Sequence, residues 1–224
     1  MANKKDKIAI FDFCDTLVSF QTANEYVRYY VKNYATLSIK WRHFIYLTLS
    51  ASGIISHMEK KHPSRNVLKR ILLWQLKGCS LEQMNIVAEQ YYNNRIKPCL
   101  IKETIAELLK CQEEGRKVMI VSGGYDIYIK YFALEYGIEF SDIISNRLLF
   151  KKNSFTGKFD LDCMGYEKVH LLNKRFEIRK NLEVVAYSDA MSDLPLLQWA
   201  DRAYVVTPYS FAKLYNFNEL RYIK

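Results

Sequence analysis

Three acidic residues follow short apolar runs that lie far apart in the sequence. Asp12 ends the run KIAIFD, and Asp189 and Asp193 come just after the run EVVAY. Such runs are typical of buried parallel strands, whose carboxyl ends form the ligand-binding edge of an α/β sheet. The three carboxylates should therefore meet at one edge, where their like charges require a neutralising cation. Oxygen ligands of this kind favour Mg²⁺.

Two further features suit the binding of an anion at the same edge. The run KVMIV is followed by Ser122, Gly123 and Gly124, whose hydroxyl and backbone N–H groups can hold an anionic oxygen. Lys168 lies in a predicted helix that can present its ammonium to the crevice. A carboxylate nucleophile, a magnesium ion, a hydroxyl donor and a lysine form a set for phosphoryl transfer. Each of these features also has a simpler explanation when it is considered alone. Asp193 could be only the N-cap of a helix, and Ser-Gly-Gly could be only a turn.

The elements that must position these residues alternate between strand and helix. Buried strands are expected at residues 7–12, 117–121, 183–187 and 203–206, with a strand-like segment at 143–150 and a hairpin or tight turn at 154–159. Helices are expected from Pro98 to Gly115, from after Gly124 to Tyr136, and at 166–179 and 193–199. Strands that alternate with helices predict an α/β fold of three layers around a parallel sheet.

Residues 20–95 are expected to form a helical insert. Apolar and aromatic residues recur on helical faces there, Pro63 is expected to start one helix, and Ser80 is expected to cap another. The insert is rich in tyrosine, and at helical spacing these side chains are expected to form its core. The alternative is that they stack on bases or sugars beside the neighbouring Arg and Lys residues.

Positive charge is concentrated in this insert. The chain carries a net charge of +9, and residues 19–97 hold 12 Lys/Arg against 4 Asp/Glu, whereas the rest holds 21 against 20. This asymmetry predicts an anionic partner, either a phosphorylated or acidic substrate, a membrane surface or a nucleic acid. The longest weakly polar stretch, 44–55, has twelve residues, fewer than the roughly 20 needed to span a bilayer. We interpret it as a buried or interfacial helix segment and expect no membrane span.

The five cysteines are odd in number and none forms a CxxC pair. A disulfide framework or a structural zinc site is therefore not expected, and a reducing cytoplasm is the predicted location. The N-terminus is basic and then apolar, but Asp12 and Asp15 interrupt the apolar run, so it is not interpreted as a signal peptide. The sequence specifies no oligomeric state.

Four ordered motifs resemble the haloacid dehalogenase superfamily, in particular its phosphoserine-phosphatase-like branch with a helical cap after the first motif. The matching segments are IAIFDFCDTLV, VMIVSGG, TGKFDLDCMGYEKVHLL and AYSDAMSDLPLL. The resemblance covers nearly all of residues 7–206. It implies a Rossmann-like core formed by residues 1–19 and 96–224, and an α-helical cap formed by residues 20–95.

The resemblance also implies a role for each matched residue. Asp12 would attack phosphorus and form an aspartyl-phosphate, and Ser122 and Lys168 would bind the phosphoryl oxygens. The expected ligands of Mg²⁺ are Asp12, the main-chain carbonyl of Cys14 and Asp189, supported by Asp193. The expected substrate- and phosphate-binding residues are Thr16, Ser122, Gly123, Lys168 and Gln21. The implied function is that of a Mg²⁺-dependent phosphatase of a small phosphorylated metabolite, with no obligate nucleic acid.

Two positions depart from the family pattern. Phosphatases of the family have a second Asp two residues after the nucleophile, which serves as general acid and base, and here that residue is Cys14. Loss of such a group typically costs about 10²–10⁴-fold in rate. The enzyme is then a slow phosphatase, acts on a substrate that needs no acid, or cleaves a non-ester bond of the phosphonate type. A catalytically inactive binding module with a basic cap is the remaining alternative.

The second departure is Gln21. Phosphoserine phosphatases that resemble this chain have a Glu nine residues after the nucleophile, where it helps to bind the substrate ammonium, and Gln21 lacks that charge. Together with the basic cap, this predicts a more anionic substrate than phosphoserine.

Overall fold

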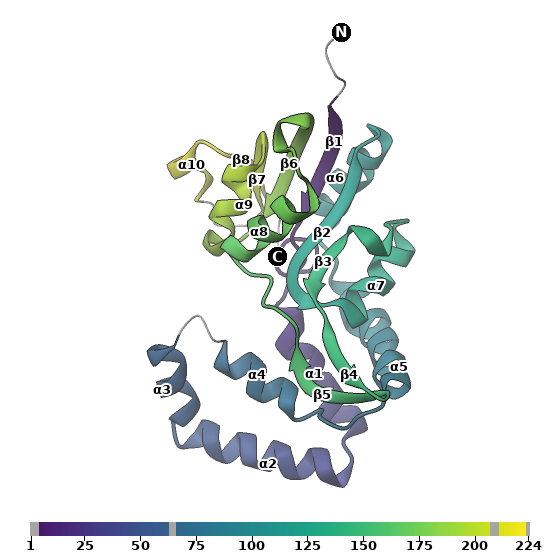
Figure 1. Ribbon diagram of the computed structural model, residues 1–224, viewed down its shortest axis with the longest axis vertical. Coiled ribbons are helices and arrows are strands. Elements are labelled where there is room, and N and C mark those ends of the chain that lie inside the picture. The colour runs from purple at the N-terminus through teal and green to yellow at the C-terminus, as the bar shows by residue number, and fades with distance from the viewer. Residues whose placement is uncertain (1–4, 63–65, 207–210, 223–224) are drawn as a thin grey trace.

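The computed structural model describes residues 5–62, 66–206 and 211–222, and its centre is a sheet of six parallel strands (Figure 1). In the order β3-β2-β1-β6-β7-β8 the strands are β3 (Ile143–Asn146), β2 (Lys117–Tyr125), β1 (Asp6–Phe11), β6 (Leu182–Ser188), β7 (Arg202–Val206) and β8 (Asn218–Leu220). A separate antiparallel pair consists of β4 (Leu148–Lys151) and β5 (Ser154–Phe159). The predicted parallel α/β fold is confirmed.

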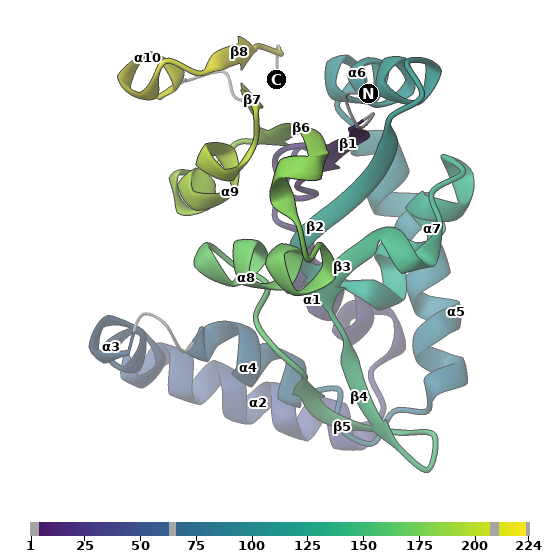
Figure 2. The same ribbon diagram turned by 45° about the horizontal axis from the view of Figure 1, so that its top comes forward.

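Helices cover both faces of the sheet, as Figure 2 shows. The helices α6 (Lys102–Glu113) and α7 (Asp126–Glu135) lie on one face, and α8 (Tyr166–Arg175) and α9 (Leu194–Trp199) lie on the other. Alternate residues of β1 explain this, because Ala9 and Phe11 belong to the hydrophobic core on the first face and Ile8 and Ile10 to the core on the second. A strand buried on both faces needs the continuous apolar run that the sequence has.

The remaining helices are grouped beyond the carboxyl ends of the central strands, apart from a short helix near the end of the chain (Figure 1). They are α1 (Thr22–Tyr34), α2 (Leu37–Ala51), α3 (Ile54–Lys61), α4 (Val67–Trp74), α5 (Leu81–Tyr91) and, near the end, α10 (Ala212–Tyr215). Ser80 caps α5 as predicted, since its hydroxyl accepts the Gln83 N–H at 3.1 Å. Pro63 lies outside the described residues.

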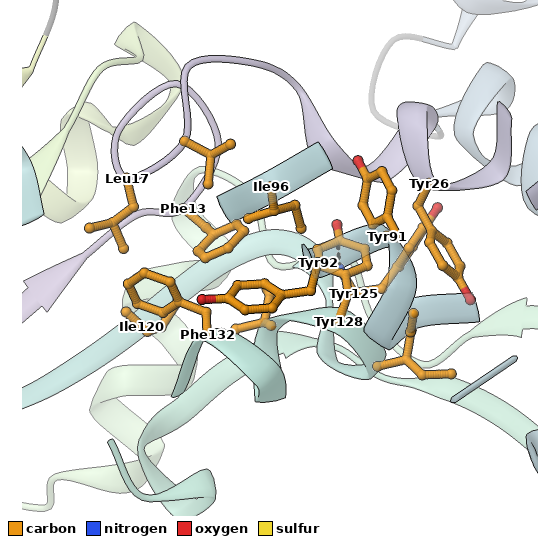
Figure 3. Packing of buried hydrophobic residues seen from close by; sticks show 14 of the residues in the cluster. Phe13, Leu17, Tyr26, Tyr91, Tyr92, Ile96, Ile120, Tyr125, Tyr128 and Phe132 are labelled. Carbon is orange, nitrogen blue, oxygen red and sulfur yellow. Dashed lines mark hydrogen bonds between the residues drawn. The ribbon is translucent and has the colours of Figure 1, made fainter. Parts of the chain in front are cut away.

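Buried tyrosines join these helices to the sheet (Figure 3). Tyr26 of α1 lies 5.4 Å from Tyr91 of α5 and 5.4 Å from Tyr128 of α7, measured between ring centroids. Tyr125, at the end of β2, lies 6.0 Å from Tyr128. All four side chains are fully buried, which supports the interpretation of the insert tyrosines as core residues.

The antiparallel pair β4–β5 also attaches to this helical region. The backbone of Gly78 donates to Phe155 at 2.8 Å, and Phe155 donates back to Cys79 at 2.8 Å. Leu81, at the start of α5, donates to Asn153 at 2.8 Å. The pair therefore braces the connection between α4 and α5 from the side of the sheet.

The structure differs from several of the predicted boundaries. The helix expected from Pro98 is interrupted, because Lys97–Cys99 form one 3-10 turn, Leu100 and Ile101 are extended with the Ile101 N–H donating to Leu17, and α6 begins only at Lys102. The strand expected to stop at Ser122 continues to Tyr125, with a shift in its pairing to β3 after Ser122. Residues 154–159, expected to form a hairpin or tight turn, are the second strand of a hairpin with β4.

The turn itself lies at Lys152 and Asn153, which both have positive φ. A helix expected to reach residue 179 ends at Arg175, and β8 was not anticipated from the sequence. Among the described residues, no helix is both long and apolar enough to cross a bilayer.

Asp126, the first residue of α7, should make the free energy of unfolding depend on pH. Burial raises the pKa of this carboxyl to about 6, aided by the charge of Asp160, although the N–H groups of Leu148 and Ile127 and the Lys130 ammonium oppose the shift. A raised carboxyl pKa means that ionisation destabilises the folded state, so the unfavourable contribution is full above pH 6 and vanishes below about pH 4.

We expect Asp126→Asn to stabilise the protein at pH 7 by about 2–3 kcal/mol and to have no effect near pH 4. Urea unfolding of both proteins at the two pH values measures the difference. Because Asn retains an oxygen that accepts the Leu148 N–H, the variant isolates the charge. An equal difference at both pH values would contradict this account.

Candidate active site

Asp12 lies immediately after β1, at the edge where the three predicted polar strand ends meet. The register of the parallel sheet explains this position, because Phe11 pairs with Ile120 of β2 and with Tyr187 of β6. The N–H of Asp12 donates to the Tyr187 carbonyl at 3.0 Å. Burial raises the pKa of the Asp12 carboxyl, although the ammonium of Lys168 opposes the shift. The side chain is therefore a desolvated carboxylate held beside one cation.

Lys168 reaches the edge from α8 and is 1% exposed. Its Nζ lies 3.0 Å from Asp12 Oδ1 and 2.6 Å from Asp193 Oδ2. Burial alone would lower the pKa of the ammonium, but the two carboxylates raise it above its ordinary value, so the charge is kept. Asp193 Oδ2 also accepts the Ser188 hydroxyl at 2.6 Å. Asp193 thus orients Lys168, and does not act as the helix cap considered as an alternative.

Asp189 lines the same cavity as Asp12 and is fixed by Thr16. The Thr16 hydroxyl donates to Asp189 Oδ1 at 3.1 Å and accepts the Asp189 N–H at 3.1 Å. Thr16 is fully buried, so we assign it to positioning Asp189 rather than to contacting phosphate. Burial and the charges of Asp12 and Asp15 raise the pKa of Asp189 to about 7. This shift marks an excess of negative charge at this point of the edge.

Ser122 and the two glycines form the third strand end. The Ser122 hydroxyl is buried and accepts the Gly124 N–H at 3.2 Å, which leaves the hydroxyl proton for another acceptor. This glycine N–H is consequently turned toward Ser122, not toward an incoming anion as expected. The glycines serve close packing, because a Cβ on Gly123 would collide with Met164 and a Cβ on Gly124 would lie 2.9 Å from Tyr128 Oη.

Cys14 is held in a chain of hydrogen bonds. The Tyr125 N–H donates to Tyr128 Oη at 2.9 Å, and Tyr128 Oη lies 2.8 Å from Thr22 Oγ1. Thr22 Oγ1 lies 3.0 Å from Cys14 Sγ, which also accepts the Thr22 N–H at 3.5 Å. Burial and the charge of Asp12 raise the pKa of the thiol to about 11. The thiol is therefore neutral near pH 7.

A further ionic cluster was missed by the sequence analysis. Lys69 of α4 donates to the Gly123 carbonyl at 2.8 Å and to Asp162 Oδ1 at 2.9 Å, and Asp162 also accepts from Asn66 and Asn146. Burial alone would raise the pKa of Asp162, but Lys69 and the amide donors lower it. The only available signal was a basic residue inside the apolar helix VLKRILLW. This cluster ties the helical region to the strand end that carries Ser122.

We expect Lys69→Met to lower the free energy of unfolding by about 2–3 kcal/mol, because Asp162 would be left buried without its cation. Lys97→Met is the matched control, since Lys97 pairs with Glu135 at a similar 2.8 Å but is half exposed; it should cost less than about 1 kcal/mol. The double variant Lys69→Met/Asp162→Asn should recover part of the loss. Equal effects of the two lysine substitutions in urea unfolding would contradict the assignment.

One cavity of about 190 Å³ connects these residues. Asp12, Cys14, Ser122, Lys168 and Asp189 line its floor, and Lys69 of α4 lines its wall. The remaining lining residues include Gln21, Gly123 and Asp193, together with Asn24, Glu59, Asn66, Leu68 and Met164. A larger cavity of about 620 Å³, between α5, α7 and the β4–β5 pair, contains none of the predicted site residues. The chemistry therefore favours the smaller cavity.

Gln21 lies at the rim of this cavity. Its amide donates to Asp15 Oδ2 at 2.7 Å, and its side chain is exposed. The Gln21 amide N–H group is therefore already bonded to a carboxylate of the protein itself.

The oxygens around Asp12 suit a divalent cation of the magnesium type. Asp12 Oδ1 is buried against a single cation, the Lys168 ammonium at 3.0 Å, and Asp189 carries excess negative charge. Within the same residues, no three His, Cys, Asp or Glu side chains are grouped as a metal site. Two carboxylates would therefore need the predicted main-chain carbonyl of Cys14 and water to complete an oxygen shell. Asp193 is engaged by Lys168 and Ser188, which leaves it a supporting position.

Comparisons with known proteins identify the family of the chain. The family model for haloacid dehalogenase-like hydrolases matches residues 9–198. A phosphoserine phosphatase of Methanocaldococcus jannaschii is 29% identical over 202 residues, which cover 88% of this chain and 83% of that protein.

Two solved structures resemble the fold. A protein of unknown function from Bordetella pertussis Tohama I aligns with a TM-score of 0.79 at 15% identity, over 96% of this chain and 98% of its own. A phospho-aspartyl intermediate analogue of phosphoserine phosphatase aligns with a TM-score of 0.62 at 21% identity, over 96% and 93% of the two chains. Since the family model spans most of the sequence, this protein belongs to the haloacid dehalogenase-like hydrolases.

Proposed function

We propose that the protein is a Mg²⁺-dependent phosphatase of a small phosphorylated metabolite, with the helices of residues 20–95 as its cap. The observation that carries this proposal is the joint position of Asp12, Lys168, Ser122 and Asp189 around one cavity of about 190 Å³. A buried carboxylate beside a single ammonium and a free hydroxyl proton suits attack on a phosphate ester, because developing negative charge finds donors already in place.

In the proposed first step, an Asp12 carboxylate oxygen bonds to phosphorus and the bond from phosphorus to the leaving oxygen breaks. Lys168 holds the Asp12 carboxylate at 3.0 Å, and with Ser122 it binds the oxygens of the transferring group. The leaving alkoxide takes its proton from solvent or from the substrate itself, because the Cys14 thiol, with its pKa raised to about 11, is a weak acid.

In the proposed second step, water bonds to the phosphorus of the aspartyl-phosphate and the bond to Asp12 breaks. Inorganic phosphate leaves and the free carboxylate is restored. Asp12, Asp189 and the Cys14 carbonyl would hold Mg²⁺, which when bound offsets the charge of the carboxylates and of the phosphoryl group. Thr16 and Asp193 keep Asp189 and Lys168 in place for both steps.

Hydrolysis of a non-ester bond of the phosphonate type is the second candidate. Cys14 is compatible with it, because such a reaction releases no alkoxide and the neutral thiol offers no efficient acid for one. The Ser122 and Lys168 pair serves both candidates, since both need an anion site. The phosphatase is favoured because a leaving alkoxide can take its proton from solvent, whereas a carbon leaving group needs a further group to accept its electron pair.

The cap side of the cavity does not offer a carboxylate at the position of Gln21. We therefore expect weak activity on phosphoserine, below about 10⁴ M⁻¹s⁻¹ in kcat/KM. A panel of phosphate esters and phosphonates, assayed with Mg²⁺ and after chelation, tests the proposal. Magnesium-dependent phosphate release from an ester supports it, whereas turnover of phosphonates alone, or activity unchanged by chelation, would contradict it.

A further inference from the structure

The outer face of α2 and α3 carries large apolar side chains that point to solvent. Each is between 42% and 86% exposed, and we call this set the apolar stripe: Leu37, Trp41, Phe44, Leu47, Ile54 and Met58. Figure 1 shows both helices at the rim of the molecule, on the side away from the sheet. The stripe is therefore a surface feature of two neighbouring helices.

The stripe reverses the usual pattern of a surface helix. Such a helix presents polar residues to water and apolar residues to the core. In α2, Ile39 is buried, whereas Leu37, Trp41 and Phe44 recur at helical spacing on the exposed side. Trp41 and Phe44 stack on each other, with ring centroids 6.0 Å apart. Contiguous exposed apolar surface of this kind marks an interaction site.

Positive charge borders the stripe. Lys40, Lys60 and Lys61 are exposed beside it. The acidic residue of these two helices, Glu59, turns inward, where its carboxylate accepts the Leu68 N–H at 3.3 Å and lines the site cavity. An apolar stripe bordered by lysines complements a partner that has an apolar layer beneath a negatively charged outer layer.

We propose that the apolar stripe docks the protein on an anionic lipid surface, with α2 and α3 lying in the plane of the membrane. Amphipathic helices with aromatic and aliphatic residues on one face and lysines at its borders bind the headgroup region in this way. Neither helix is long enough to span a bilayer, so the surface orientation is the one available to them.

Other occupants fit the stripe less well. Nucleic acid would use the lysines and the two aromatic rings, but the four aliphatic side chains cannot stack on bases. A second copy of this chain would bring two positively charged surfaces together. A partner protein that inserts a helix would need a groove. The stripe residues line neither the 190 Å³ nor the 620 Å³ cavity, so neither cavity provides such a groove at the stripe.

Docking would also bring the active site close to the lipid surface. Met58 belongs to the stripe, and the next residue, Glu59, lines the cavity that contains Asp12. The proposal does not depend on the reaction, since it rests on the exposed side chains alone.

Co-sedimentation of the full chain with vesicles tests the proposal. We expect binding to an equimolar mixture of phosphatidylcholine and phosphatidylglycerol and much weaker binding to phosphatidylcholine alone. Leu37→Ser/Leu47→Ser should weaken binding at least ~10-fold, and Lys60→Glu/Lys61→Glu should weaken it with loss of the salt dependence. Leu134→Ser/Leu214→Ser is the matched control, because it removes two exposed leucines from helices elsewhere and should change nothing.

Unchanged thermal unfolding of each variant shows that the fold is intact, since all these side chains are exposed. Equal binding by the stripe variant and the control would overturn the proposal. So would binding of a single-stranded RNA in place of the vesicles, or a dimer in the absence of lipid that Leu37→Ser/Leu47→Ser dissociates.

Discussion

Replacement of Asp12 by asparagine should abolish phosphate release, with a loss on the order of 10⁴-fold or more in kcat. The amide is no nucleophile toward phosphorus, and no other carboxylate is available at the same place, because Asp193 is bound to Lys168 and Ser188 and Asp189 to Thr16. Initial rates with the best ester of the substrate panel, at saturating Mg²⁺, measure the effect.

The same variant should remain folded. Burial raises the pKa of the Asp12 carboxyl, which means that its charge is unfavourable in the folded state, and the amide removes this charge. Lys168 keeps its 2.6 Å contact with Asp193. We expect a free energy of unfolding equal to or above that of the wild type. Residual activity within about 10-fold of the wild type would rule out Asp12 as the nucleophile.

Replacement of Cys14 by aspartate should raise kcat/KM on alkyl phosphates by about 10²-fold or more. The site already contains the donors that a carboxylate at residue 14 requires, because the Thr22 N–H and hydroxyl both contact Cys14 Sγ. Tyr128 accepts the Tyr125 N–H and contacts the Thr22 hydroxyl at 2.8 Å, which holds Thr22 beside residue 14. The new carboxyl would supply the missing acid and base.

Cys14→Asn is the matched control, since it has the shape of aspartate without an acidic proton, and it should not raise the rate. The gain from Cys14→Asp should shrink on an aryl phosphate, whose leaving group departs without a proton. A lower rate on alkyl phosphates for Cys14→Asp would instead show that the thiol has a function of its own.

Much of the site could be predicted from the sequence because strand ends in a parallel sheet meet at one edge. Asp12, Ser122 and Asp189 each follow an apolar run, so their proximity follows from topology and register. Asp193 follows the same run as Asp189, and Lys168 was expected on a helix facing the crevice, although a lysine on a helix has no local signal of burial. The tyrosines of the insert were also predictable, because their spacing matches a helical face.

The remaining features depend on contacts between distant segments. Lys69 and Asp162 are 93 residues apart in the chain, and nothing local to either residue indicates their partner. Gly123 and Gly124 suggested a turn, but they lie in β2, whose pairing with β3 resumes at Tyr125 and Asn146. Thr16 was expected at the phosphate, and only the structure shows that Asp189 occupies both of its hydrogen-bonding positions.

Covalent trapping of the phosphoryl group tests the role of Asp12 most directly. With a ³²P-labelled aryl phosphate, transfer of the phosphoryl group to Asp12 needs no acid. Hydrolysis of the aspartyl-phosphate needs a base to activate water, and Cys14 does not supply one. The intermediate should therefore accumulate. Rapid acid quenching, followed by peptide mass spectrometry, should then locate the label on Asp12 in close to one copy per chain, and none on Asp12→Asn. Steady turnover without label on the protein, or label on another residue, would contradict the account.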